Sequence, residues 1–267
     1  MGVSMSAARA SGLSARSIPP RWYGPLAILV GLLTWELAGR YVNPLFFAPP
    51  SAVAQAWVAL VASGELPTAS TASLLALGIG FGSAVIVGLV VGTLMALNKP
   101  TKYVLDPFVN TLMAAPTIAL MPIIVLGFGL ELQGRAVIIF VFSVWPIIVT
   151  TEAGMSSVKA QYIEMARSFG LSSRQMLLEV RLRSALPAIM VGMRVALIRA
   201  LSGLVVAELF LALTGIGFLL RVYGTSFRTA ELFALIATVV IAAMLGSGIL
   251  NRFAGRFSAW QQGMRWD

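Results

Sequence analysis

The sequence predicts an all-α membrane protein with six transmembrane helices and a cytoplasmic helix-Gly-helix loop between spans 4 and 5. Two features of composition support this fold class, because 58% of the 267 residues are hydrophobic and only 11% are charged. An ordinary soluble domain is about half apolar and about a quarter charged. The third observation is that Lys and Arg are concentrated in alternate segments between the apolar stretches.

Six apolar stretches approach the length of about 20 residues that a helix needs to cross a bilayer. The segment 1–21 is rich in Ser, Ala and Arg, which predicts a disordered N-terminus. No convincing cleavage site follows the first stretch, so we expect a retained anchor. The transmembrane region is expected at 22–250, followed by a cytoplasmic tail at 251–267. The expected spans are Trp22–Gly39, Ala72–Leu97, Val104–Phe128, Ala136–Ala153, Leu186–Leu213 and Leu232–Leu250.

The basic residues orient these spans. If the N-terminus is cytoplasmic, fifteen of the 19 Lys and Arg residues fall on the cytoplasmic side. The remaining four, on the outside, are Arg40, Arg135, Arg221 and Arg228. Cytoplasmic loops of membrane proteins contain an excess of Lys and Arg, so both termini are expected in the cytoplasm. The net charge of +9 is then a topology signal, and no nucleic acid partner is expected.

The first external segment, Arg40–Thr71, contains a candidate surface helix at Ser51–Ser63 with Ser51 as its N-cap. Glu36, near the outer end of the first span, is expected at the membrane interface. The second span contains two glycine pairs with a spacing of four, Gly78/Gly82 and Gly88/Gly92. This spacing is typical of close helix packing.

The cytoplasmic loop, at about 154–185, predicts a short helix, a glycine turn and a second helix. Apolar residues recur on one face of the helix Tyr162–Phe169, and Gly170 is suited to the left-handed position that ends it. Ser172 and Gln175 have the spacing of a capping box for the second helix. Pro187 then marks entry into the fifth span. From spacing alone, an amphipathic linker lying on the membrane explains this pattern equally well.

The pattern Glu164-Met165-Ala166, three residues, Gly170 and nine residues to Val180 resembles the "EAA" loop of ABC importer permeases. Met165 replaces the second Ala, and Arg183 replaces the first Pro of the family pattern. From about 35 to 252 the chain is similar to the branch of binding-protein-dependent permeases for sulfonates, taurine, nitrate and thiamine precursors. The segments on which this similarity depends are Leu45–Ser51, Ala114–Pro122, Ile123–Gly129 and Val205–Leu209.

This resemblance implies a permease of the bacterial inner membrane that imports a small solute, such as a sulfonate or another small organic anion. It implies as partners ABC ATPase subunits, a soluble substrate-binding protein and a second permease copy in a homodimer, all at a lipid membrane. The sequence leaves a related second permease as the alternative to a second copy. The chain itself lacks the G-x-x-x-x-G-K-[ST] phosphate loop and has three lysines, so ATP hydrolysis is expected on another polypeptide. The residues expected to contact the ATPase are Tyr162, Glu164, Ala166, Phe169 and Gly170.

Candidate residues for the translocation path lie in the third and fifth spans. Three prolines interrupt the third span, and Pro116 and Thr117 are expected beside the path, although kinks needed only for packing explain them equally well. Arg199 and Glu208 are ionisable residues in the fifth span. They lie roughly 13 Å apart along one helix, so they cannot pair with each other. The alternatives are a role in the path or a gate, and pairing with another helix or with a lipid headgroup.

Two other functional classes fit less well. An intramembrane enzyme would need a Ser-His dyad or an Asp pair, but the chain has no His or Cys, and its two Asp residues are Asp106 and Asp267. A self-contained secondary transporter would show inverted repeats, which the sequence does not display. No catalytic residue, metal site or cofactor is expected.

Overall fold

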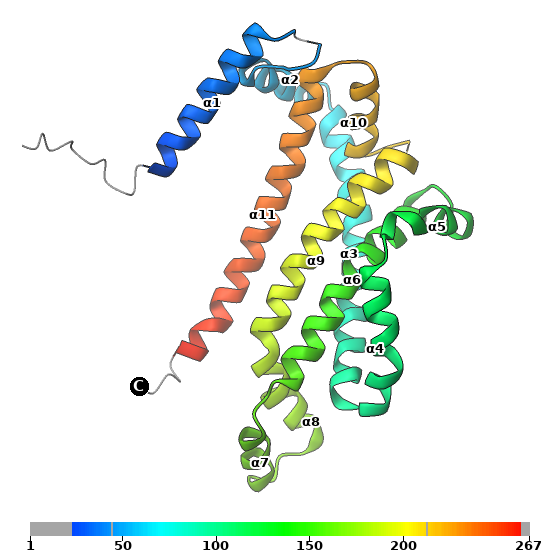
Figure 1. Cartoon of the computed structure of the whole chain (residues 1–267), viewed down its shortest axis with the longest axis vertical. Helices are drawn as coiled ribbons and strands as arrows, with labels where there is room; N and C mark the ends of the chain where they lie inside the picture. Colours follow the sequence, from blue (N-terminus) through cyan, green and yellow to red (C-terminus); the bar gives the residue numbers. More distant parts are fainter. Residues whose placement is uncertain (1–22, 44, 212, 263–267) are drawn as a thin grey trace, which may run out of the picture.

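The computed structural model describes residues 23–43, 45–211 and 213–262, with side chains described up to residue 253. Within these ranges every regular element is a helix. The molecule is elongated, with α2 and α10 at one end and α7 and α8 at the other (Figure 1). We call the end with α7 and α8 the loop end and the opposite one the far end. The expected disordered segment 1–21 and the last residues of the tail, 263–267, lie outside the described residues.

The helices follow one another with short connections. In chain order they are α1 (Tyr23–Tyr41), α2 (Pro50–Ala62), α3 (Glu65–Leu97), α4 (Lys99–Ala114), the 3-10 helix η2 (Thr117–Leu120), α5 (Met121–Phe128), α6 (Leu132–Ser156), α7 (Ala160–Ser168), α8 (Ser173–Gln175), the π-helix η3 (Met176–Arg181), α9 (Leu182–Leu211), α10 (Ile216–Thr225) and α11 (Thr229–Gln262).

Four helical stretches within the described residues are long and apolar enough to cross a membrane. They are Glu65–Leu97, Leu132–Ser156, Ser173–Leu211 and Thr229–Phe253. The third expected span forms a bent pair of helices and would be a fifth crossing. The first expected span forms α1, which contains Glu36 and Arg40 in its last turns and is not among the four. The structure therefore supports a multi-pass helical protein, and the number six stays a prediction.

The third span is broken, not kinked. Its two halves, Lys99–Ala114 and Thr117–Phe128, meet at an angle of 99°. Pro116 directly precedes η2, and Pro122 lies in the first turn of α5, where a missing N–H is tolerated. Pro107 by contrast lies inside α4. The expectation of one proline-containing helix over Val104–Phe128 was therefore wrong.

Three helices differ from the sequence-based expectations. The second loop helix and the fifth span form one continuous helix of 39 residues, Ser173–Leu211, with Pro187 in its interior. No Gly interrupts this stretch before Gly192, and the wider π-helical turn of η3 precedes the proline. α11 continues to Gln262, well into the expected tail. α10, between the last two long helices, was not predicted.

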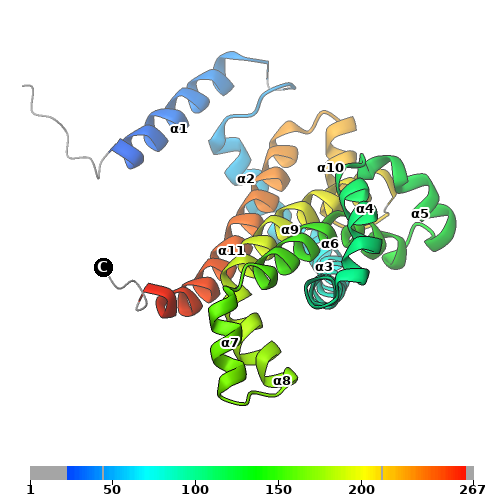
Figure 2. The ribbon, with the colours of Figure 1, turned by 60° about the horizontal axis from the view of Figure 1, so that its bottom comes forward.

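The core of the bundle is built from α3, α6 and α9, which Figure 2 shows side by side. Small residues of α3 face α6 at every fourth position: Ala76, Gly80, Ala84, Gly88 and Gly92. A Cβ added at Gly88 would lie 2.7 Å from the Ile147 side chain, so the backbone of α3 lies directly against α6 there. The expectation for Gly88/Gly92 is confirmed. For Gly78/Gly82 it was wrong, because a Cβ at either position would meet nothing within 4 Å.

α1 stands apart from this bundle (Figure 2), and all its side chains from Tyr23 to Thr34 are exposed. Only its last turns are anchored, where the Trp35 indole donates to the Ala48 carbonyl at 3.0 Å. The Glu36 carboxylate accepts from the N–H and the hydroxyl of Ser51, at 3.1 and 2.8 Å. Ser51 is the second residue of α2, so the Glu36 carboxylate accepts a hydrogen bond from one of the free N–H groups at the start of that helix. The expected Ser51 cap was therefore wrong, since Pro49 occupies the N-cap position.

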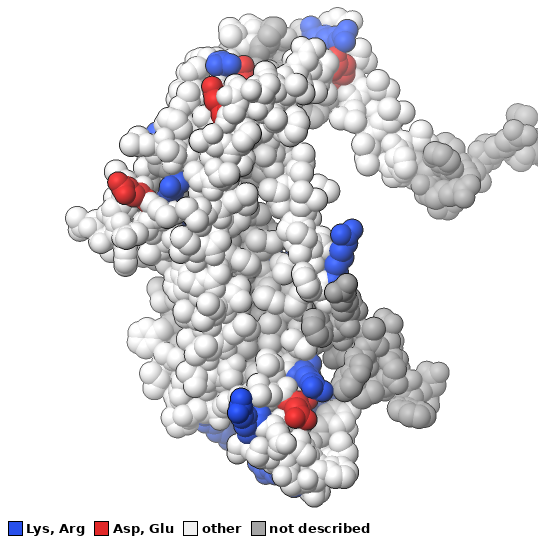
Figure 3. Space-filling model, turned by 180° about the vertical axis from the view of Figure 1, so that it is seen from behind, with Lys and Arg blue, Asp and Glu red and all other residues white. Residues whose placement is uncertain are grey.

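Charged side chains gather toward the two ends of the molecule, and most of the surface between them is uncharged (Figure 3). The middle of the molecule exposes Leu, Ile, Val and Phe side chains, such as Leu74, Ile86 and Ile198. This is the surface expected of a protein surrounded by lipid.

The glycine stripe of α3 generates a prediction with an internal control. Gly88→Ala places a methyl group against Ile147, and overpacking of this kind costs about 1–3 kcal/mol. Gly82→Ala makes the same change on an open face, and it gains up to about 1 kcal/mol of helix propensity. In detergent micelles the Gly88 variant should unfold at a lower temperature than wild type, and the Gly82 variant should not. Equal unfolding temperatures for the two variants would contradict this helix contact.

Candidate functional site

The short helix α7 ends in a glycine turn, as the sequence predicts. Gly170 has φ +72°, in the left-handed region, where a Cβ is strained. Its N–H bonds to the Arg167 carbonyl at 2.9 Å, and the N–H of Leu171 bonds to the Ala166 carbonyl at 3.1 Å. These two bonds form a Schellman motif, so the direction of the chain after α7 is fixed by local hydrogen bonds.

The next helix starts at once with a complete capping box. The Ser172 hydroxyl accepts from the N–H of Gln175, and the Gln175 side chain accepts from the N–H of Ser172 at 2.9 Å. α8 then continues through η3 into α9 without a break. A helix that begins in the loop is therefore continuous with the longest span of the bundle.

The apolar residues of α7 divide between two faces. Ala166 is buried and Ile163 is half-buried. Tyr162 and Phe169, which the sequence grouped with them, are exposed, as is Met165. Exposed fractions of 77% for Phe169 and 54% for Met165 leave an apolar surface at the tip of the loop. We call Tyr162, Met165 and Phe169 the loop-tip surface. Glu164 is exposed beside it.

The candidate path residues are not brought together. Pro116 and Thr117 lie at the break between α4 and η2, where Pro116 is exposed and Thr117 half-buried. Arg199 is a half-buried residue in the middle of α9. Glu208 lies near the end of the same helix and is fully buried. A role of these residues in translocation stays a prediction.

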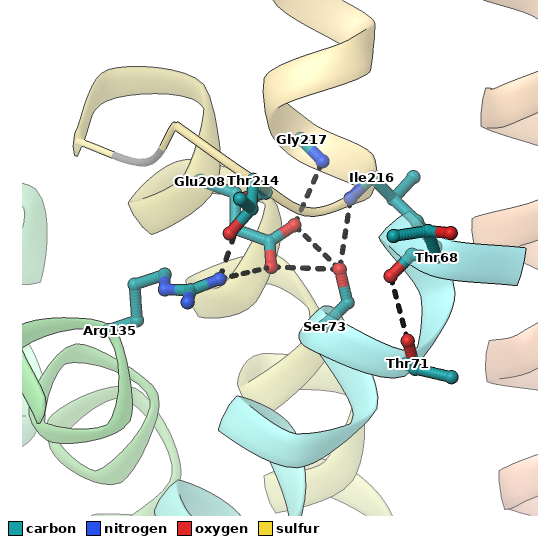
Figure 4. Close-up of polar contacts among 8 residues, drawn as sticks. All are labelled: Thr68, Thr71, Ser73, Arg135, Glu208, Thr214, Ile216 and Gly217. Atoms are coloured by element: carbon teal, nitrogen blue, oxygen red, sulfur yellow. Dashed lines mark hydrogen bonds and ion pairs between the residues drawn. The ribbon is translucent and has the colours of Figure 1, made fainter. Parts of the chain in front are cut away.

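Glu208 is paired with other helices (Figure 4). Its carboxylate lies 3.3 Å from Arg135 Nη1 of α6 and accepts from the Ser73 hydroxyl of α3 at 2.8 Å. It also accepts from the N–H of Gly217, at the start of α10, at 2.9 Å. The Ser73 hydroxyl in turn accepts from the N–H of Ile216 at 2.9 Å. Pairing with another helix, one of the two alternatives for Glu208, is thus present.

Sequence reasoning missed Ser73 and Arg135. Arg135 was assigned to an external loop, but it lies in the first turn of α6 and is 7% exposed. Two signals could have identified the cluster. Glu208 needs a buried cation or several donors, and Gly215 and Gly217 follow it closely enough to bring backbone N–H groups near its carboxylate.

Two cavities lie near this cluster, lined by neighbouring residues of the α9–α10 connection. One, of about 430 Å³, opens at the far end beside Glu65, Thr68, Thr214 and Gly215. The other, of about 410 Å³, lies between α3, α9 and α11 and is lined by mostly aliphatic residues, with Ser73, Glu208 and Ile216 at one side. No group of three or more His, Cys, Asp or Glu suited to a metal ion occurs among the described residues. Around these cavities the helices enclose mostly apolar space, and the polar contacts of Glu208 and Ser73 hold the start of α10 in place.

Comparison with known proteins agrees with this architecture. The family model described as "Binding-protein-dependent transport system inner membrane component" matches residues 84–261. The taurine transport system permease protein TauC of Escherichia coli (strain K12) is 31% identical over 243 residues, which is 89% of this chain and 88% of TauC. The bicarbonate transport system permease protein CmpB of Synechococcus elongatus is 30% identical, over 73% of this chain and 67% of CmpB.

Solved structures share the fold. An inward-facing structure of the MetNI methionine ABC transporter matches with a TM-score of 0.62 at 20% identity, and the match covers 69% of this chain and 92% of that chain. The family match spans well over half of the sequence. The chain therefore belongs to the family of binding-protein-dependent transport system inner membrane components, the permease subunits of ABC importers.

Proposed function

We propose that this permease moves a small solute across the bacterial inner membrane while a separate ATPase subunit, docked on α7, hydrolyses ATP. The observation that carries the proposal is the short helix α7, which exposes the loop-tip surface at one end of the molecule. A helix fixed by a Schellman turn and joined to two long helices can act as a lever on both. The ATPase-docking residues are Tyr162, Glu164, Ala166, Phe169 and Gly170, with Ala166 supporting the helix from its buried side.

The proposed solute is a small organic anion such as a sulfonate, delivered by a soluble substrate-binding protein. The names of the relatives support this class, since TauC is a taurine permease and CmpB a bicarbonate permease. Both solutes are small, and each contains a negatively charged group of oxygen atoms. The proposed path passes Pro116, Thr117, Arg199 and Glu208, because broken helices and ionisable residues at membrane depth occur where a cavity or neighbouring helices satisfy them.

A second copy of the chain is proposed to complete the membrane unit, with lipid around it. The exposed apolar side chains of α1 and α5, among them Ile28, Leu33, Ile123 and Leu126, need such a partner or lipid. We further propose six spans with both termini in the cytoplasm. The distribution of Lys and Arg supports this orientation, which puts the loop end inside and the far end outside.

Docking of α7 predicts the effect of Gly170→Asp. The left-handed φ costs a non-Gly residue about 1 kcal/mol, and the new charge lies beside the loop-tip surface. The variant should reach the membrane but co-purify with less ATPase and take up less solute. Glu164→Lys should have a smaller effect, because an exposed charge contributes little unless it is paired.

Gly64→Asp is the matched control for this experiment. Gly64 also has a left-handed φ, of +80°, and open space around it, but it lies at the far end. It should cost similar strain while leaving ATPase association at the wild-type level. Normal association and uptake for Gly170→Asp would show that α7 is not the docking element.

The orientation can be tested with single cysteines, because the chain contains none. A cysteine at Gln262 should resist a membrane-impermeant thiol reagent in intact cells. A cysteine at Ser226, exposed at the far end, should react. Labelling at Gln262, or protection at Ser226 that persists after permeabilisation of the outer membrane, would contradict the proposed topology.

A path beside the broken span predicts that Thr117→Trp blocks uptake without preventing assembly. The indole would fill the break between α4 and η2, where Thr117 is half-buried. Uptake in proteoliposomes and co-purification of the ATPase are measured on the same sample. Unchanged uptake would mean that Pro116 and Thr117 serve packing alone.

A further inference from the structure

α6 and α9 form an antiparallel pair that is in close contact from one end to the other. At the loop end, a Cβ at Gly154 would lie 2.9 Å from Ala188. Farther along, Gly192 of α9 lies directly against Thr150 of α6, and Gly203 lies against Phe142. Contacts between backbone and side chain at this distance leave no room for the helices to slide or separate without disrupting several of them.

This pair is joined at both ends. At the loop end the chain itself connects the helices through α7, α8 and η3. At the far end the connection is the ion pair between Arg135 in the first turn of α6 and Glu208 in the last turns of α9. The two side chains are 9% and 0% exposed, so water does not weaken their attraction as it does at a surface.

The Glu208 carboxylate also holds the start of α10 in place. A Cβ at Gly215 would overlap the Glu208 carboxylate, and one at Gly217 would overlap its Cβ, so only glycine allows this approach. The N–H of Gly217 points at the carboxylate, where a negative charge at a helix N-terminus is favourable. The other end of α10 is held to α3, because the Tyr223 hydroxyl bonds to the Glu65 carboxylate.

The contact between α10 and Glu208 does not require Arg135. Without it, the carboxylate would still accept from Ser73 and Gly217. A buried ion pair also gives little net stability once its desolvation is included. Moreover, Arg135 is incompletely satisfied, since its Nε is buried and without a hydrogen-bond partner in the described part of the chain. What Arg135 provides is a connection between α6 and the start of α10.

We infer that Arg135 and Glu208 are positioning residues that transmit movement of the cytoplasmic loop to α10 and to the partition between the two cavities. Thr214 and Gly215 line the outer cavity, and Ser73, Glu208 and Ile216 line the inner one. A displacement of the paired α6 and α9 therefore moves the residues that separate these cavities. This inference rests on the proposed docking of the ATPase at α7.

The test uses the full complex and a reporter in the α9–α10 connection. A cysteine at Leu213, which is 81% exposed and lines the outer cavity, is reacted with an impermeant thiol reagent in proteoliposomes. The reaction rate is measured with and without a non-hydrolysable ATP analogue. In the otherwise wild-type chain the analogue should change the rate about fivefold or more, the size typical of coupling between distant sites.

The decisive variant is Arg135→Gln, which removes the ion pair while Glu208 keeps its contacts with Ser73 and Gly217. It should assemble with the ATPase and react at the wild-type rate without nucleotide, but lose the response to the analogue. The control is Arg228→Gln with Glu231→Gln, an ion pair of 2.6 Å at the same end whose side chains are 55% and 20% exposed, which should keep the full response. If Arg135→Gln does not assemble, Arg135→Gln with Glu208→Gln is used, which leaves no unpaired buried charge, and its response to the analogue is scored.

Two results would overturn the inference: a wild-type rate that does not respond to the analogue, and a response that survives in the variant that lacks the Arg135–Glu208 ion pair. A merely structural role would change the rate without nucleotide and the amount of assembled complex together, and would leave the response. Failure of the ATPase to co-purify with the wild-type chain would instead refute the proposed docking at α7, so the two failures are distinguishable.

Discussion

The start of a helix leaves free N–H groups that need acceptors, and two such helix starts shape the far end of the molecule. Two glutamates supply those acceptors, each from the helix that precedes the one it satisfies. Glu36 of α1 accepts from Ser51 in α2, and Glu208 of α9 accepts from Gly217 in α10. Both connections therefore fold back onto the preceding helix, and the short helices α2 and α10 lie over the bundle (Figure 1).

In the middle of the molecule, small residues and not polar ones allow the helices to pack closely. α6 is packed on two sides, by the glycine and alanine stripe of α3 and by Gly192 and Gly203 of α9. Lipid provides no hydrophobic driving force between helices, so close van der Waals contact has to hold them together. The result is a three-helix unit in close contact along its length.

Local signals in the sequence predicted part of the local structure. The loop sequence predicted the Gly170 turn and the Ser172 capping box, because each depends on residues within one or two turns, whereas the prolines of the third span indicated an interruption but not two separate helices. The ion pair between Arg135 and Glu208 joins residues 73 positions apart, and no periodicity identifies it. Likewise, glycines occur on two faces of α3, and only the position of α6 decides that Gly88 and not Gly82 is at the contact.

The continuous helix from Ser173 to Leu211 also limits where the permease can bend. Its two irregular features are the π-helical turn Met176–Arg181, which precedes the contacts of α9 with Gly154 of α6, and Pro187, which lies between the two contacting residues Ala185 and Ala188. π-turns and prolines are the usual places where a helix deforms. Both features lie in the section of the helix next to the loop. From Ala188 to Glu208 the helix is packed against α6, so this section is the one that the fold holds most firmly.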